Sequence, residues 1–164
     1  MSTDVRPEEA ADDRAIRHLH VAAFPSPAEA DLVERLRADD DLVLSLVAVV
    51  DGKVIGHVAL SRMSAPFRAL GLGPIAVDGG ERRRGIGALL IRDTLNRAKQ
   101  AGWDAIFVLG DPAYYQRFGF SVHAAEGFAS PYAGPHLMVL PLAAGRLPAA
   151  GGAISYAPAF AALG

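Results

Sequence analysis

Apolar residues recur along this chain with two spacings, one typical of helices and one typical of strands. Residues 12–23 place apolar side chains on one helical face behind two acidic residues, which the helix dipole favours at that end. Phe24-Pro25 ends this predicted helix. A second short helix is predicted over residues 28–37, where Leu32, Val33 and Leu36 share one face among charged residues.

The period then changes to that of β-strands. Leu42–Val50 and residues 53–61 are rich in β-branched residues, and the Asp51-Gly52 pair between them suits a two-residue hairpin turn. The remaining predicted elements are a strand at 72–77, a helix at 89–101, a strand at 105–109, a short helix at 112–118 and a strand at 137–142. This order predicts a mixed α/β fold with a partly antiparallel sheet.

Length and composition favour a single domain. The chain has 164 residues, of which 51% are hydrophobic, enough for one buried core but too few for two ordinary domains. We expect the core over about residues 4–142. Residues 143–164 are dominated by Ala, Gly and Pro, and we expect this tail to be an edge segment or loosely ordered.

Net charge and cysteine content limit the partners and the kinds of chemistry that the protein can have. The net charge of −2 gives no overall basic field for nucleic acid or an anionic membrane, and only the arginines at 82–84 form a local basic cluster. The absence of cysteine excludes disulfides, thiolate nucleophiles and cysteine-ligated metals. The acidic start lacks the features of a signal peptide, and no apolar run approaches the ~20 residues of a membrane span. We expect a cytoplasmic protein without nucleic-acid, membrane or metal partners.

The segment "GPIAVDGGERRRGIGALLIRDTLNRAKQAG" predicts an anion site. A strand over residues 73–77 leads through a turn into a helix, whose first amide N–H groups and positive dipole end converge on one small volume. Gly85 and Gly87 lack β-carbons, so a phosphate could approach the backbone closely, and the arginines add charge. The alternative is a tight turn beside solvated arginines. Neither a Walker loop nor a dinucleotide fingerprint fits this spacing.

Two motifs resemble those of a known family. Residues 82–87, RRRGIG, resemble the Q/R-x-x-G-x-G/A loop of the GNAT superfamily of N-acetyltransferases, also placed between a strand and a helix. Downstream, "GDPAYYQRFGF" resembles the second signature of that family, in which a tyrosine precedes a Gly-Phe pair by four residues. The Gly-Asp-Pro opening and the Tyr-Tyr pair look most like a bacterial YhbS-like branch. The resemblance covers roughly residues 4–142.

The resemblance implies an acetyl-coenzyme A (acetyl-CoA) site and direct transfer to an amine, without a covalent enzyme intermediate or a metal. Acetyl-CoA would lie in a V-shaped opening between the strands that end at Val77 and Leu109. The implied cofactor-binding residues are Ile75, Ala76 and Val77 for the pantetheine arm and Arg82, Arg83, Arg84, Gly85, Ile86, Gly87 and Ala88 for the pyrophosphate. The amine is carried by a small molecule or a protein, and a homodimer is among the open oligomeric states.

Tyr115 occupies the position where this family often has a general acid. A phenol beside the sulfur could donate to the leaving thiolate, whose pKa should be near that of a free thiol, roughly 8.5. The alternative is that Tyr115 only packs its ring, as we expect of Tyr114. Asp111 before Pro112 is expected to be a helix cap.

The sequence leaves the general base and the class of protein open. The candidate bases are Glu29, Glu34, His57, Asp78 and His123. A non-catalytic acyl-CoA sensor and a purely structural domain are the alternatives to an acetyltransferase, although an intact loop at residues 82–87 argues against the structural domain.

Overall fold

A computed structural model describes residues 2–143 and 145–163, with the backbone alone for residues 82–84. The elements in chain order are β1 (Asp4–Pro7), η1 (Ala10–Asp12), α1 (Asp13–Ala23), α2 (Ala28–Ala38), β2 (Leu42–Val50), β3 (Lys53–Arg62), β4 (Ala69–Val77), η2 (Gly79–Arg84), α3 (Ile86–Gln100), β5 (Ala105–Leu109), α4 (Pro112–Tyr115), η3 (Gln116–Phe118), α5 (Val122–Ala125), β6 (Phe128–Ala129), β7 (Leu137–Pro141), β8 (Gly152–Ala153) and η4 (Pro158–Leu163), where η marks a 3-10 helix.

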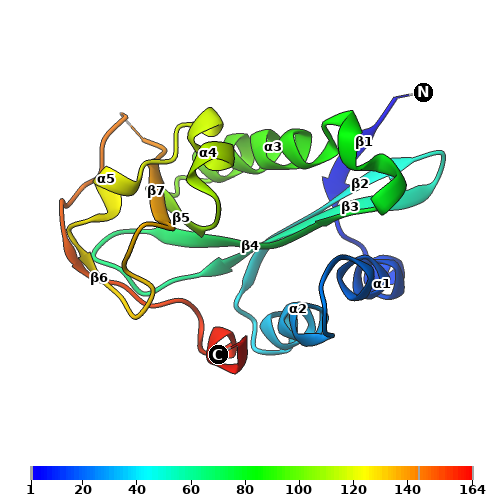
Figure 1. Ribbon diagram of the computed structural model, residues 1–164, viewed down its shortest axis with the longest axis horizontal. Helices are drawn as coiled ribbons and strands as arrows, with labels where there is room; N and C mark the ends of the chain where they lie inside the picture. Colours follow the sequence, from blue (N-terminus) through cyan, green and yellow to red (C-terminus); the bar gives the residue numbers. More distant parts are fainter. Residues whose placement is uncertain (1, 144, 164) are drawn as a thin grey trace.

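A six-stranded sheet in the order β1-β2-β3-β4-β5-β7 forms the centre of the molecule (Figure 1). Only β4 and β5 pair in parallel, and the other neighbours are antiparallel. The predicted mixed α/β class with a partly antiparallel sheet is therefore confirmed.

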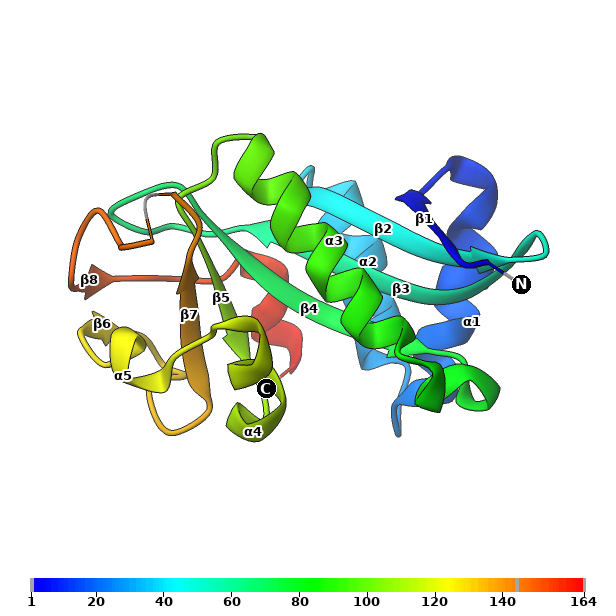
Figure 2. The same cartoon turned by 90° about the horizontal axis from the view of Figure 1, so that it is seen from above.

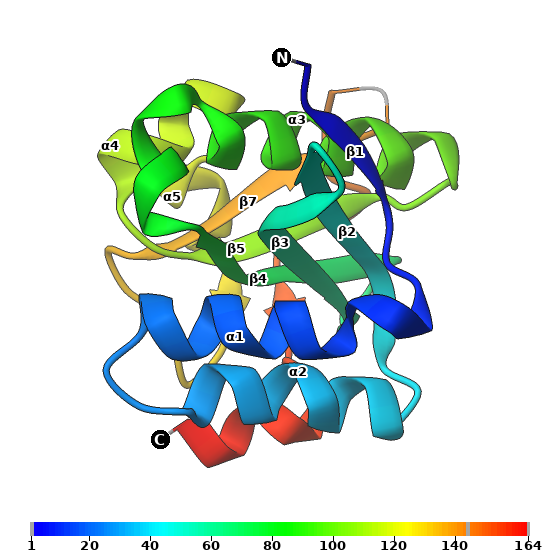
Figure 3. The ribbon, with the colours of Figure 1, turned by 90° about the vertical axis from the view of Figure 1, so that its right-hand side faces the viewer.

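Helices cover both faces of the sheet, with α3 on one side and α1 and α2 on the other (Figure 3). Alternate residues of β2 serve the two faces: Leu46 packs in the cluster that contains Leu90 and Ile91 of α3, and Val47 packs with Ile16 and Val33. Burial on both faces explains why the strands read as continuous apolar runs rather than as apolar and polar alternation.

The turn chemistry of the sequence is also reproduced. Val50 pairs with Lys53 across the β2–β3 hairpin, and the two turn residues Asp51 and Gly52 have φ angles of 51° and 76°. Positive φ at both central residues is what a two-residue hairpin turn requires. The helix ending at Ala23 is confirmed as well, because Phe24 is already extended at φ −121° and ψ 156°.

Several features differ from the sequence prediction, which also did not include the short elements η1, η2, α5, β6, β8 and η4. The edge strand β1 was not predicted, since its four residues carry no alternating pattern. Both β4 and α3 begin three residues earlier than expected, at Ala69 and Ile86. The short helix predicted over residues 112–118 is divided into α4 and a 3-10 turn.

The carboxyl-terminal segment packs against the rest of the chain. Its strand β8 pairs in parallel with β6, and Ile154, Ala157 and Ala159 are buried. Ala157 and Ala159 contact Leu32 and Leu36, so η4 covers one side of α2. The described residues 152–163 therefore pack as an edge segment, which was one of the two alternatives, and part of this segment lines a pocket.

Candidate active site

The sheet opens between β4 and β5. The two strands pair from Ala69 with Ala105 as far as Leu72 with Val108, after which β4 follows β3 and β5 follows β7 (Figure 2). Pro74 follows this last pair and has no N–H to continue a ladder. The β5-facing edge of residues 73–77 has no strand partner among the described residues, so backbone polar groups there are available to a ligand.

The loop after β4 leads into the start of α3. Gly85 has a φ of 73°, in the left-handed region where glycine is favoured, and a β-carbon there would meet no atom within 4 Å, so this position favours glycine for its conformation. The first helical hydrogen bond runs from the Leu89 N–H to the Gly85 carbonyl, at 3.0 Å. The amides of residues 86–88 precede that bond and have no partner within the helix, which makes this terminus suited to an anion.

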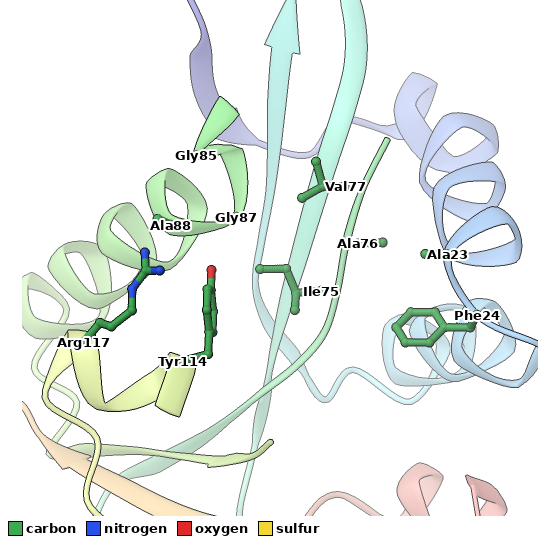
Figure 4. Close-up of a pocket in the computed structure, with 10 residues that line it drawn as sticks. All are labelled: Ala23, Phe24, Ile75, Ala76, Val77, Gly85, Gly87, Ala88, Tyr114 and Arg117. Carbon is green, nitrogen blue, oxygen red and sulfur yellow. The ribbon is translucent and has the colours of Figure 1, made fainter. Parts of the chain in front are cut away.

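A cleft of about 660 Å³ joins these two features. Its lining residues are Ala23, Phe24, Ile75, Ala76, Val77, Gly85, Gly87, Ala88, Tyr114 and Arg117 (Figure 4). Six of the residues predicted for the cofactor therefore lie on one cleft. The Ile86 side chain is instead buried in the core between α3 and the sheet, so only its backbone could serve a ligand. The side chains of Arg82, Arg83 and Arg84 lie outside the described part of the chain.

Sequence reasoning did not assign four residues of this cleft to the cofactor: Ala23, Phe24, Tyr114 and Arg117. Phe24 was not predicted to line the cofactor cleft, but it projects from the α1–α2 connection toward β4 (Figure 4). Tyr114 was expected only to pack, yet a β-carbon built on Gly87 would lie 3.2 Å from its hydroxyl oxygen. The Arg117 guanidinium lies 4.8 Å from the centre of the Tyr114 ring, which places a cation on the cleft. The position of Arg117, about one helical turn after the two tyrosines, could have indicated from the sequence that it lies on the same side as one of them.

A second pocket of about 340 Å³ adjoins the cleft. Its lining residues are Phe24, Glu29, Leu32, Leu72, Gly73, Pro74, Ile75, Leu109, Tyr115, Tyr132, Tyr156, Phe160 and Leu163. Phe24 and Ile75 line both spaces, so the cleft and the pocket meet at these two side chains. The two adjacent tyrosines face different spaces: Tyr114 lines the cleft and Tyr115 lines the pocket.

Tyr115 is held in place by close packing. A β-carbon at Gly110 would lie 2.5 Å from the Tyr115 ring, so only glycine leaves room for the ring at the end of β5. The ring also makes an edge contact with Phe120, at 5.7 Å between centres. Burial, with a smaller contribution from Tyr114, raises the pKa of Tyr115 to about 12. The hydroxyl is therefore protonated at neutral pH and can donate a hydrogen bond.

The structure separates the five candidate bases. Glu29 lines the second pocket. Glu34 is exposed and pairs with Arg17 at 3.2 Å, and His123 is 93% exposed and lies beside Glu126. The Asp78 carboxylate accepts a hydrogen bond from the Gly80 N–H at 3.0 Å, which makes it the cap of η2. Of the four, only Glu29 lies on either space.

The fifth candidate, His57, belongs to a buried hydrogen-bond chain. Its Nε2 lies 2.7 Å from the Ser45 hydroxyl, which donates to the Glu8 carboxylate, and its Nδ1 lies 2.8 Å from His20 Nε2. Burial lowers the pKa of His20 to about 4, and burial together with His20 and Arg37 lowers that of His57. Both rings are therefore neutral at pH 7, and the chain ties α1 to β2 and β3 rather than lining either space.

Two further observations bear on function. No group of three or more His, Cys, Asp or Glu side chains in the described ranges is placed to hold a metal ion. None of the described helices is long and apolar enough to cross a bilayer.

The chain matches known proteins in sequence. Residues 14–120 match the family model described as acetyltransferase (GNAT) family. The chain is 41% identical over 124 residues to the uncharacterized N-acetyltransferase YhbS of Escherichia coli K12, covering 73% of this chain and 74% of that protein. It is 29% identical over 147 residues to the L-amino acid N-acetyltransferase AaaT of the same organism, covering 79% of this chain and 87% of that protein.

Solved structures agree. The crystal structure of Escherichia coli YhbS in complex with CoA superimposes with a TM-score of 0.92 at 35% identity, covering 99% of this chain and 93% of that one. A GNAT family acetyltransferase from Brucella melitensis in complex with acetyl-CoA gives a TM-score of 0.82 at 32% identity, covering 97% and 98%. The chain therefore belongs to the GNAT family of acetyltransferases and resembles YhbS in both sequence and structure.

Proposed function

We propose that this protein transfers the acetyl group of acetyl-CoA to a primary amine, by direct attack within a ternary complex. The observation that carries the proposal is the junction of the two spaces. The cleft ends at amides of residues 86–88 that have no partner within α3 and suit a pyrophosphate, the pocket offers a separate place for an acceptor, and they meet at Phe24 and Ile75. The complexes of the two relatives with CoA and acetyl-CoA support this use of the cleft.

The residues of the cleft fit an extended ligand with an anionic centre. The free edge of residues 73–77 suits the amide groups of a pantetheine arm, which would add to β4 as a further strand does. The amides at residues 85–88 and the Arg117 guanidinium suit the pyrophosphate. Acetyl-CoA itself supplies an acyl group activated as a thioester.

Tyr115 assists departure of the sulfur. As the amine nitrogen bonds to the carbonyl carbon, negative charge develops on the oxygen and then on the sulfur as the C–S bond breaks. The Tyr115 hydroxyl is protonated and belongs to a residue that lines the second pocket, and in this proposal it donates a hydrogen bond to that sulfur. Bond formation and bond cleavage both occur on the bound reactants, so a nucleophilic side chain is not required.

Glu29 accepts a proton from the amine in this proposal. Alkylammonium groups have a pKa of about 10.4, so at neutral pH the acceptor arrives charged and must lose a proton before its lone pair can attack. A carboxylate on the pocket wall both attracts the ammonium and accepts its proton, directly or through water. We therefore propose Glu29 as the proton acceptor among the five candidates.

The setting proposed for this reaction is the cytoplasm, with residues 1–164 acting as one acetyltransferase domain. The absence of cysteine fits a reducing compartment, and the net charge of −2 does not favour nucleic acid as a partner.

Release of the CoA thiol tests the proposal. Because the chain contains no cysteine, a thiol reagent reads only the CoA that is released. Amine-dependent thiol release that fits a sequential rather than a ping-pong rate law is expected. Acetyl-CoA binding without thiol release for any amine would instead indicate an acyl-CoA sensor, and a ping-pong pattern would contradict direct attack.

A further inference from the structure

The pocket beside Tyr115 has an unusually apolar wall for a site that receives a charged group. Eight of its lining side chains are hydrocarbon in character: Phe24, Leu32, Leu72, Pro74, Ile75, Leu109, Phe160 and Leu163. Three more are tyrosines, which present ring faces and edges as well as hydroxyls. A ligand that fills this space gains most from burying apolar or aromatic surface, at roughly 25 cal/mol per Å².

The charged group on the wall of this pocket is negative. Among the described residues that line the pocket, Glu29 is the only one with a carboxylate, and none has a basic side chain. Burial raises the pKa of Tyr115 to about 12 and that of Tyr156 further, so these hydroxyls are neutral. A ligand carboxylate would lose its hydration without gaining a cationic partner and would also face Glu29, whereas an ammonium group gains a counter-charge. Tyrosine rings add favourable contacts to a cation.

The size and the walls of the pocket favour a small molecule. Its volume of about 340 Å³ is near the lower end of the ~300–1,000 Å³ typical of small-molecule sites. Helix α2 supplies Glu29 and Leu32 on one side, and the carboxyl-terminal segment supplies Tyr156, Phe160 and Leu163 on another. The segment that packs on α2 through Ala157 and Ala159 thus forms one side of the pocket.

From these observations we infer the class of acceptor: a small primary amine on an apolar or aromatic body that carries no carboxylate. The inference rests on the proposed acetyl transfer and adds the substrate class. The ammonium group is placed toward Glu29 and the junction with the cleft, and the apolar body lies against Phe160 and Leu163. An α-amino acid is disfavoured, although one relative is named for L-amino acids, because its carboxylate would have no cationic partner on the described wall.

Three matched amines test this inference by thiol release at saturating acetyl-CoA. 2-Phenylethylamine has the predicted features, phenylalanine adds only a carboxylate to it, and ethylamine lacks only the ring. We expect kcat/KM for 2-phenylethylamine to exceed that for each of the other two amines by more than about tenfold. Phenylalanine would bury a carboxylate without a cationic partner, and ethylamine would leave out the apolar surface of the ring.

Glu29→Gln tests the wall directly. At pH 7 it should lower kcat/KM for 2-phenylethylamine by about tenfold or more, because the ammonium loses its counter-charge and proton acceptor. The gap to the wild type should narrow as the pH approaches the pKa of the amine, about 10, where the acceptor is already uncharged. Glu34→Gln is the matched control on the same helix, since Glu34 is exposed and pairs with Arg17; it should leave kcat/KM within about twofold.

The outcomes separate this inference from the proposed function. If phenylalanine or ethylamine is used as well as 2-phenylethylamine, or if Glu29→Gln matches the wild type at pH 7, the acceptor class is wrong while acetyl transfer stands. If none of the three amines releases thiol, the inference is also wrong. Calorimetry with acetyl-CoA then decides whether the proposed function fails too, because a protein that does not bind acetyl-CoA cannot transfer its acetyl group.

Discussion

Replacing Tyr115 by Phe removes one oxygen atom from a residue that lines the second pocket and leaves the packing of the ring intact. The contacts with Gly110 and Phe120 involve the ring alone, so the fold should be preserved. If the hydroxyl assists departure of the sulfur, the loss belongs to the transition state and appears in kcat rather than in the affinity for acetyl-CoA.

The raised pKa of Tyr115 sets the expected size of this loss. A phenol with a pKa of about 12 is a weaker acid than a thiol near 8.5, so complete proton transfer to the thiolate is uphill by about 3.5 units, or about 5 kcal/mol. Tyr115 should therefore act mainly as a hydrogen-bond donor. We expect a kcat about 100-fold lower in Tyr115→Phe, at the lower end of the ~10²- to 10⁴-fold range for general acids.

Tyr114→Phe is the matched control, because it removes the same atom from the neighbouring residue. The Tyr114 hydroxyl lies beside Gly87 on the cleft, so this variant should raise the KM for acetyl-CoA and leave kcat nearly unchanged. Single-turnover rates at saturating substrates compare the two variants. A Tyr115→Phe rate within threefold of the wild type, or a larger loss of rate in Tyr114→Phe, would refute the role given to Tyr115.

Two further predictions concern the loop and the buried histidines. Gly85→Glu should abolish acetyl-CoA binding measurable by calorimetry, while the circular dichroism spectrum stays native-like. Gly85→Ala adds only the strain of a positive φ and should keep most of the affinity for acetyl-CoA. Equal acetyl-CoA affinities of the two variants would contradict an anion site at this position. Lowering the pH from 7 to 5 should reduce the free energy of unfolding in urea by roughly 2 kcal/mol through His20, at 1.36 kcal/mol per unit below 6.5. The folded state keeps His20 neutral while the unfolded state binds a proton, so stability falls between pH 6.5 and about 4. A flat profile would contradict the buried neutral pair. Loss of this pH dependence in His123→Gln, the control at an exposed histidine, would contradict it as well.

Local sequence patterns were sufficient to predict much of the fold and the part of the site formed by the cleft. The β2–β3 hairpin and the strand–loop–helix unit around Gly85 depend on neighbouring residues, so the sequence predicted both. The strand β1 was missed because its four residues are stabilised by pairing with β2 rather than by a pattern of their own.

The second pocket could not be read from the sequence because it is assembled from distant segments. Phe24, Ile75, Tyr115 and Phe160 come from four separate parts of the chain and meet only through tertiary packing. The opposite orientations of Tyr114 and Tyr115 depend on the short α4 turn and on the space left at Gly110, neither of which a periodicity reveals.

A crystal structure with bound CoA tests the central claim most directly, through two distances. We predict pyrophosphate oxygens at about 2.7–3.2 Å from backbone nitrogens of residues 85–88, the ordinary range for such hydrogen bonds. The CoA sulfur should lie at the junction by Phe24 and Ile75, within about 3.5 Å of the Tyr115 hydroxyl oxygen. A pyrophosphate away from the start of α3, or a sulfur beyond reach of Tyr115, would contradict the account.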